Sequence, residues 1–143
     1  MELKDIASVA GKGGLFRIVK PTRNGVILES MDEKKARIIA HSNQRVSTLS
    51  EISIYTTDQE GAVELGVVLA KIHSEFNGDT GVDNTSNNAE LRSFMNHILP
   101  EHDEEKVYPS DIKRLVSWYK ILLTEAPELL SISEEKTESE KED

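Results

Sequence analysis

The chain has 143 residues, a formal net charge of −9 at pH 7 and no cysteine. This length allows one or two small domains, and the lack of thiols excludes disulfides, thiolate metal sites and cysteine nucleophiles. The N-terminus has no apolar signal-peptide core, and no apolar run approaches the ~20 residues of a membrane span. We therefore expect a cytoplasmic protein without a membrane partner.

The charge is divided unevenly along the chain. Residues 1–57 contain nine Lys and Arg against six Asp and Glu, which gives +3, whereas residues 58–143 contain eight against twenty, which gives −12. Such asymmetry can mark a nucleic-acid-binding face. However, most domains that bind duplexes carry a denser basic patch. We favour a solvated surface of mixed charge.

The first apolar residues, Leu3, Ile6 and Val9, have helical spacing and are followed by Gly-Lys-Gly-Gly at 11–14. The tetrad resembles part of a phosphate-binding loop. It lacks the complete G-x-x-x-x-G-K-[ST] pattern, and it precedes a predicted strand where a phosphate-binding loop would open a helix. We interpret the glycines as a sharp turn into that strand.

Residues 15–56 contain short, β-branched runs separated by turn residues, which predict an antiparallel sheet. We expect a small SH3-like barrel or a strongly bent sheet. After a polar turn at 32–35, a third strand is predicted over 36–41 and a fourth over 52–56. The segment between these two strands is polar and is not predicted to be a strand.

Asn24-Gly25 predicts a two-residue hairpin with a type I′ turn, in which Arg23 pairs with Val26. This register brings opposite charges together in two further pairs, Lys20 with Glu29 and Arg17 with Asp32. Because Pro21 has no N–H to give to the ladder, we expect a bulge or a sheet edge near it.

Thr57 and Glu60 have the spacing of a capping box and predict a helix that begins there. Its wide apolar stripe contains Leu65, Val68, Leu69, Ile72 and Phe76. Residues 77–88 are nearly all turn formers and predict a linker loop. The Asp and Asn residues of this loop do not have the spacing of a calcium-binding loop.

Two further helices are predicted, one over 91–99 and one that Ser110 caps and that ends near Pro127. We interpret Trp118 as a packing residue more readily than as a ligand platform. The last residues are rich in acid and poor in apolar side chains, which predicts disorder. The expected domains are a β-rich domain with its linking helix, a linker loop, a helical hairpin and an acidic tail, at 1–76, 77–88, 89–130 and 131–143.

His97, Glu101, His102 and Asp103 cluster around a predicted helix end. The two histidines are five residues apart with a proline between them, which is not the spacing of a helical zinc pair. We interpret this segment as a solvated loop. No serine stands in a G-x-S-x-G elbow. The sequence therefore predicts no catalytic, cofactor-binding or metal-binding residue.

Three segments resemble a family of bacterial proteins classed as a domain of unknown function: GKGGLFRIVKPTRNGVILESMD, SEISIYTTD and LPEHDEEKVYPSDIKRLVSWYKILL. The likeness covers most of the chain except the Asn-rich loop and the acidic tail. It implies a β-rich N-terminal segment followed by a smaller helical one, in a bacterial cytoplasmic protein. It implies no activity. The resemblance of the β part to SH3-like barrels rests on strand number and length, and such barrels have many functions.

We therefore expect an α+β protein that acts as a non-catalytic adaptor and binds another protein. The alternative is binding of RNA or a ribonucleoprotein through a basic strand face, and an enzyme is the third hypothesis. No cofactor is expected. The candidate binding surface comprises Arg17, Lys20, Arg23, Lys34, Lys35, Arg37, Arg45, Tyr55 and Trp118.

Overall fold

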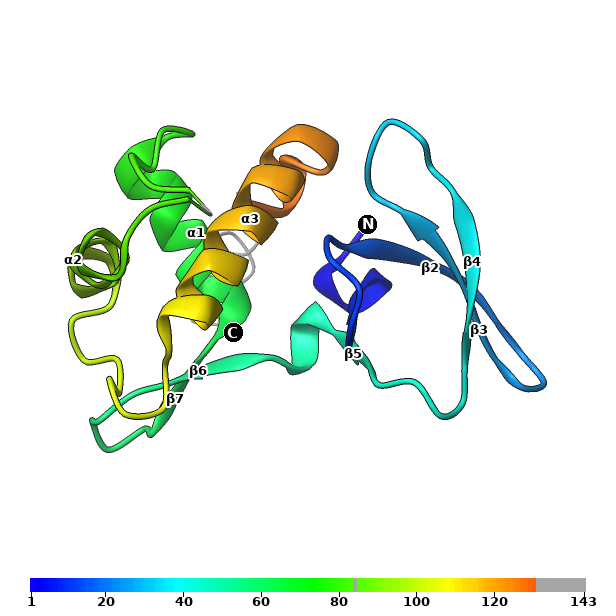
Figure 1. Ribbon diagram of the computed structural model, residues 1–143, viewed down its shortest axis with the longest axis horizontal. Coiled ribbons are helices and arrows are strands. Elements are labelled where there is room, and N and C mark those ends of the chain that lie inside the picture. Colours follow the sequence, from blue (N-terminus) through cyan, green and yellow to red (C-terminus); the bar gives the residue numbers. More distant parts are fainter. Residues whose placement is uncertain (84, 131–143) are drawn as a thin grey trace, which may run out of the picture. The chain divides into compact units, whose positions relative to one another are not determined.

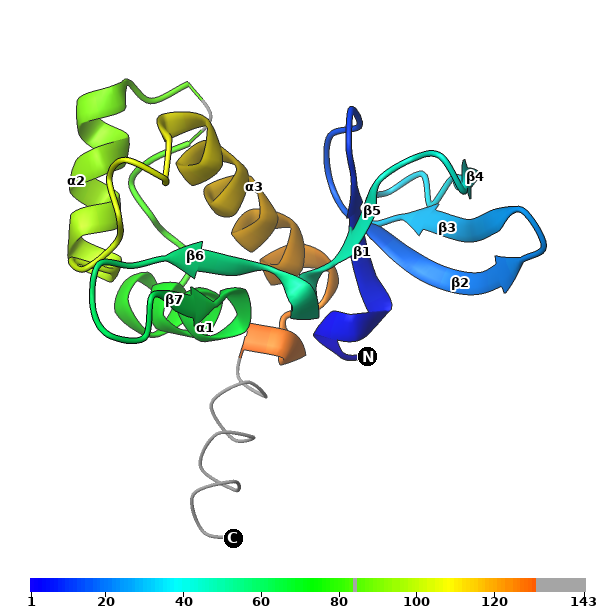
Figure 2. The same ribbon diagram turned by 90° about the horizontal axis from the view of Figure 1, so that it is seen from below.

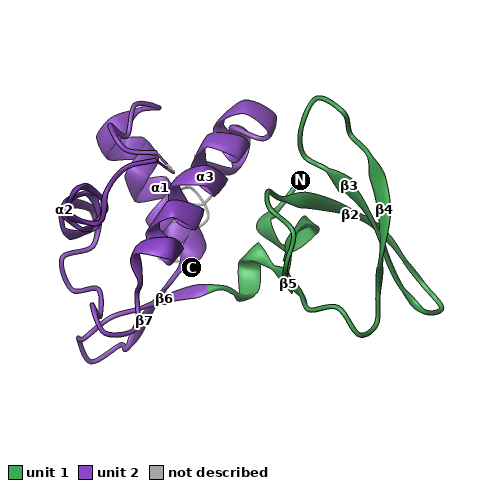
Figure 3. Ribbon diagram, viewed as in Figure 1, with its two compact units in different colours: residues 1–52 green, residues 53–143 purple. Residues whose placement is uncertain are grey.

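The computed structural model describes residues 1–83 and 85–130 and has an α+β fold (Figure 1). The chain divides into two compact units, Met1–Ile52 and Ser53–Asp143 (Figure 3). We expected the first domain to extend to residue 76. The boundary in the sequence lies earlier, after residue 52, because the helix Leu65–Phe76 contacts the helices of the second unit. The predicted tail, 131–143, lies outside the described residues.

The first unit contains one antiparallel sheet with the strand order β4-β3-β2-β1-β5 (Figure 2). Its strands are β1 (Ile6–Val9), β2 (Phe16–Thr22), β3 (Gly25–Ser30), β4 (Arg37–His41) and β5 (Val46–Thr48). Two 3-10 turns accompany them, η1 (Leu3–Asp5) and η2 (Leu49–Glu51). Among the described residues, no pairing of β4 with β5 closes the sheet. The prediction of an antiparallel sheet is confirmed, without a closed barrel.

One face of this sheet forms the core of the first unit. The buried residues Val9, Phe16, Leu28 and Ala40 form a cluster on that face. Partly buried apolar side chains pack against the cluster, namely Ile18, Val26, Ile38 and Val46. Because successive side chains of a strand point to opposite faces, the residues between these core positions lie on the other face.

The hairpin between β2 and β3 differs from the prediction by one residue. Arg23 and Asn24 form the loop, and Thr22 pairs with Gly25. Neither Asn24 nor Gly25 has a positive φ, so the predicted type I′ turn is wrong. Glycine serves another purpose here, because a Cβ on Gly25 would collide with the backbone carbonyl oxygen of Ala40 on β4.

The predicted charge pairs change with this register. Lys20 is opposite Ile27 and Arg17 is opposite Glu29. The register shifts between Ile18 and Lys20. A bulge was expected near Pro21, and it lies just before that residue.

Three strands were not predicted, two in the first unit and Ala62–Glu64 in the second. Ile6–Val9 was assigned helical spacing, but it is β1, which pairs with β2 on one side and β5 on the other. Burial of three of its four residues hides the alternation that identifies a strand. β5 has only three residues, too few for a periodic signal. The glycine turn before β2 is confirmed, with φ of 85° at Gly11 and 80° at Gly14.

The second unit begins with a hairpin of β6 (Ser53–Tyr55) and β7 (Ala62–Glu64). The predicted fourth strand is β6, in a second sheet. Thr57 does not begin a helix, because the loop closes on the Asp58 carboxylate. That carboxylate accepts bonds from the Thr56 hydroxyl at 2.7 Å and the Gly61 N–H at 3.2 Å. The bond from Thr56 is the main reason why the pKa of Asp58 lies below its usual value.

The helices of the second unit are α1 (Leu65–Phe76), α2 (Asn88–Ile98) and α3 (Pro109–Glu125). They confirm the three predicted helical patterns, although α1 begins eight residues after Thr57. α3 begins at Pro109, and the Asp111 carboxylate accepts the Tyr108 N–H at 3.0 Å, so Ser110 is not its cap. None of the described helices combines the length and apolarity that a membrane crossing requires.

Buried contacts hold these helices together. Tyr119 of α3 is fully buried, and its hydroxyl is 2.9 Å from Nδ1 of His73 on α1. Burial raises the pKa of Tyr119, because the phenolate would lose its hydration. Phe76 of α1 and Phe94 of α2 stack with their ring centroids 5.4 Å apart.

Candidate functional site

The candidate functional site is the face of the first unit's sheet that points away from the core. We call it the outer face and define it by Arg17, Lys20, Ile27, Glu29, Arg37 and Ile39. The register arranges these residues in two rows, each with one residue from β2, one from β3 and one from β4. The sheet thus brings together three of the seven predicted cations.

The first row consists of Glu29 between two arginines. Glu29 Oε1 is 3.2 Å from Arg17 Nη2, and Glu29 Oε2 is 3.6 Å from Arg37 Nε. The Glu29 side chain is only 17% exposed, whereas those of Arg17 and Arg37 are 40% and 62% exposed. Pairs this exposed stabilise a fold by no more than about 1 kcal/mol. Their main effect is to fix two guanidinium groups and leave one net positive charge.

The second row contains the exposed apolar residue of the sheet. Ile39 is 55% exposed and lies opposite the partly buried Ile27, which in turn pairs with Lys20. Ile39 was not among the predicted surface residues. A signal for it was present, because the adjacent Ile38 and Ile39 of one strand must point to opposite faces.

The predicted cations Lys34 and Lys35 lie in the turn before β4, outside the outer face. The Asp32 carboxylate holds this turn by accepting the N–H groups of both lysines at 3.0 Å. It also accepts the Ser30 hydroxyl at 2.8 Å, and this bond is the main reason why the pKa of Asp32 lies below its usual value. The backbone of these lysines therefore shapes the turn, and both side chains are exposed.

The other predicted surface residues are dispersed. Arg23 lies in the β2–β3 loop and Arg45 directly precedes β5. Tyr55 is in the second unit and is 53% exposed, with the Lys106 ammonium 5.2 Å from its ring centroid. Trp118, also in the second unit, is only 7% exposed and does not offer its ring to a partner.

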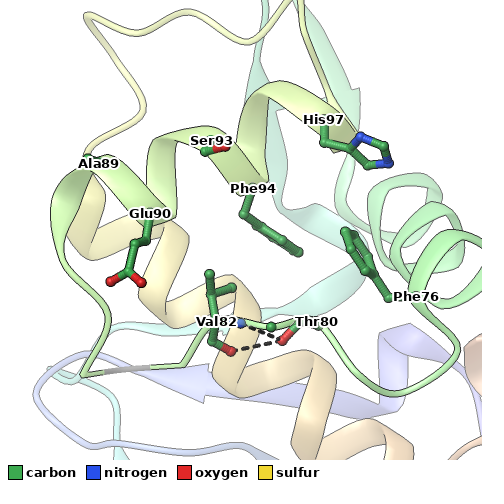
Figure 4. Close-up of a pocket in the computed structure, with 9 residues that line it drawn as sticks. Phe76, Thr80, Val82, Ala89, Glu90, Ser93, Phe94 and His97 are labelled. Atoms are coloured by element: carbon green, nitrogen blue, oxygen red, sulfur yellow. Dashed lines mark hydrogen bonds between the residues drawn. The ribbon is translucent and has the colours of Figure 1, made fainter.

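The second unit has an open pocket of about 570 Å³ next to α2 (Figure 4). Phe76 and Phe94 give it an aromatic side, and the His97 ring lies 5.5 Å from Phe76. The Thr80 hydroxyl donates to the Val82 carbonyl at 2.8 Å, so part of the predicted linker is a wall of this pocket. The lining residues are Phe76, Thr80, Gly81, Val82, Ala89, Glu90, Ser93, Phe94 and His97.

The polar side chains of this pocket include Ser93, His97 and Glu90. Ser93 and His97 are one turn apart on α2, and His97 Nε2 is 3.4 Å from Glu75 Oε2. In the part of the chain that the structure describes, no hydrogen bond joins Ser93 to His97, as an activated serine requires. Glu90 is engaged in a capping box, where it accepts the Asn87 N–H at 2.9 Å.

The two histidines of the cluster near the end of α2 have different environments. His97 is exposed, whereas His102 is buried and uses both of its ring nitrogens. His102 Nδ1 is 2.7 Å from the Leu99 carbonyl oxygen, and Nε2 is 3.0 Å from Arg92 Nη1. A carbonyl needs a donor and a guanidinium needs an acceptor, so Nδ1 carries the proton and Nε2 accepts. Neither nitrogen is available to a metal.

No cluster of three or more potential metal ligands occurs among residues 1–83 and 85–130.

Comparisons with known proteins give two family matches. One model, Domain of unknown function (DUF5606), matches residues 3–49, and another, Domain of unknown function (DUF6852), matches residues 52–122. The division between the two matches lies within a few residues of the division between the two compact units. No curated protein matches the chain.

A solved structure is similar to this chain over most of its length. It is a solution NMR structure of a structural-genomics target from Bacteroides vulgatus, with 32% sequence identity and a TM-score of 0.65. The match covers 87% of this chain and 88% of the other.

Proposed function

We propose that this chain, which belongs to a bacterial family built from two domains of unknown function, is a non-catalytic adaptor. It binds a protein partner through the outer face of the first unit. Its setting is the cytoplasm, and the sheet of the first unit is a variant of the SH3-like barrel. The barrel assignment rests on five short antiparallel strands.

The observation that supports this function is the exposure of Ile39 between charged side chains. Ile39 adjoins Ile27 on the outer face, with Arg37 two residues away on the same face. Protein interfaces combine an apolar centre with a polar rim and are enriched in arginine. The outer face combines these features within three strands.

Nucleic acid is the alternative ligand, and the composition of the outer face argues against it. Binding of single strands relies on several free cations and on aromatic rings that stack with bases. Arg17 and Arg37 share the carboxylate of Glu29, and Phe16 is buried in the core. An enzymatic function, the third hypothesis, has no supporting group at the outer face.

The test uses the full chain as bait in a lysate of the bacterium from which it comes. We expect the wild-type chain to retain a defined protein that the Ile39→Asp and Arg37→Gln variants lose. Lys12→Glu is the matched control, because Lys12 is an exposed cation of the same unit outside the outer face. Thermal melts establish that each variant is folded.

The proposal is supported only if retention follows the outer-face variants. Equal retention by wild type, Ile39→Asp and Arg37→Gln would contradict it, as would retention that depends on added RNA.

A further inference from the structure

The strand β4 forms an edge of the sheet, and its hydrogen bonds establish which backbone groups point outward. The Ser30 N–H donates to the Ala36 carbonyl at 2.9 Å, and the Ser42 N–H donates to the Asn24 carbonyl at 3.0 Å. These bonds lie just beyond the two ends of the β3–β4 ladder. In an antiparallel ladder, hydrogen-bonded pairs alternate with non-hydrogen-bonded pairs.

Counted inward from either end of the β3–β4 ladder, this alternation identifies the same hydrogen-bonded pairs. Ile38 and Ala40 direct their N–H and C=O groups towards β3, whereas Arg37, Ile39 and His41 direct theirs away from the sheet. The open edge therefore presents the backbone of the same residues whose side chains lie on the face opposite the core.

One of these three residues is already satisfied. The His41 N–H donates to Gln44 Oε1 at 2.9 Å, and the His41 carbonyl accepts the Gln44 N–H at 2.9 Å. For Arg37 and Ile39, the described residues provide no backbone partner on the outward side. Two N–H groups and two carbonyls are thus available at the centre of the edge.

We propose that β4 accepts an extended segment of a partner protein as an additional antiparallel strand, an inference that rests on the proposed adaptor function. Strand addition of this kind gains affinity from backbone bonds and specificity from alternate side chains. The partner residue opposite Ile39 is apolar, because it packs on Ile39 and Ile27. The partner residue opposite Arg37 is acidic, because it faces a guanidinium group on the same side of the sheet.

Charge favours such a segment over a second copy of this chain. If two β4 strands paired antiparallel about Ile39, Arg37 of each would lie opposite His41 of the other, so neither arginine would gain an acidic partner. Basic side chains at a sheet edge oppose this kind of self-pairing. An acidic segment converts the same basic side chains into favourable cross-strand pairs.

The test is a titration of the isotope-labelled full chain with a blocked peptide, Thr-Glu-Thr-Val-Thr-Glu-Thr, followed by NMR. We expect the largest shifts at the Arg37 and Ile39 amides and slower solvent exchange of these two N–H groups. A peptide with Lys in place of both Glu tests the charges. A peptide N-methylated at Val tests the backbone bonds, and each change should weaken binding by about tenfold.

Variants of the chain complete the test. Arg37→Gln should reduce the preference for Glu over Lys in the peptide by at least about threefold. Ile39→Thr, which retains a β-branched side chain, should weaken binding of the Glu peptide and of the Lys peptide. Lys12→Glu should leave the affinity of the chain for these two peptides unchanged. Absence of binding at millimolar peptide, or equal binding of the N-methylated peptide, would overturn the strand-addition proposal.

A failure of the strand-addition proposal can be distinguished from a failure of the adaptor function. If a captured partner still depends on Arg37 and Ile39 while the exchange of their N–H groups does not slow, the outer face binds protein by side chains alone. If capture is also insensitive to both variants, the adaptor proposal fails as well.

Discussion

At the scale of single residues, His102 shows how a side chain that resembles a metal ligand in sequence can serve packing. It is only 3% exposed and joins the Leu99 carbonyl to Arg92, whose Nη1 also donates to the Val107 carbonyl at 3.1 Å. The sequence predicted that His102 lies in a solvated loop, because most of the residues next to it are acidic. Its burial depends on a turn between α2 and α3 that no local pattern reveals.

His102→Ala is expected to lower the free energy of unfolding by about 2 kcal/mol, because it leaves the Leu99 carbonyl and Arg92 without a buried partner. Chemical denaturation of the full chain measures this change. His97→Ala is the control, since the His97 side chain and its contact with Glu75 are solvent-exposed, and it should change stability by no more than about 0.5 kcal/mol. Equal effects of the two substitutions would contradict the bridging role of His102.

At the scale of elements, long segments were predicted more reliably than short ones. α2 and α3 have 11 and 17 residues, long enough for their apolar stripes to identify them. β1 and β5 have four and three residues, so neither shows a reliable period. The outer-face arginines were predicted, but their shared partner Glu29 was not, because that depends on a bulge between Ile18 and Lys20.

Gly25→Ala tests the observed hairpin register. The added methyl group would meet the backbone of Ala40, which cannot move without disturbing β4, so we expect a loss of about 1–3 kcal/mol in stability. Gly13→Ala is the matched control, because a Cβ there meets no atom within 4 Å and its φ is not positive. Comparable stability of the two variants by thermal unfolding would show that β3 and β4 are not in this register.

At the scale of the whole molecule, charge separates the two binding hypotheses. The sequence is basic over residues 1–57, at +3, and acidic over 58–143, at −12. We therefore expect no RNA or DNA binding tighter than the ~10⁻⁴–10⁻⁶ M of non-specific contacts. Titration with single-stranded and duplex oligonucleotides at ~0.15 M salt measures this affinity.

The same titration with a chain that lacks residues 131–143 is the control for the acidic tail. Submicromolar binding by the full chain would favour the nucleic-acid hypothesis. Such binding by the shortened chain alone would identify the tail as a competitor of nucleic acid and would also favour that hypothesis.

Amide hydrogen exchange of the full chain, alone and with its captured partner, is the most direct test of the central claim that the outer face and the β4 edge bind a protein. We predict that the partner slows exchange at Arg37 and Ile39 above all, because their outward N–H groups become hydrogen-bonded. Exchange at these two residues that is unchanged by the partner, with protection confined to the second unit, would contradict it.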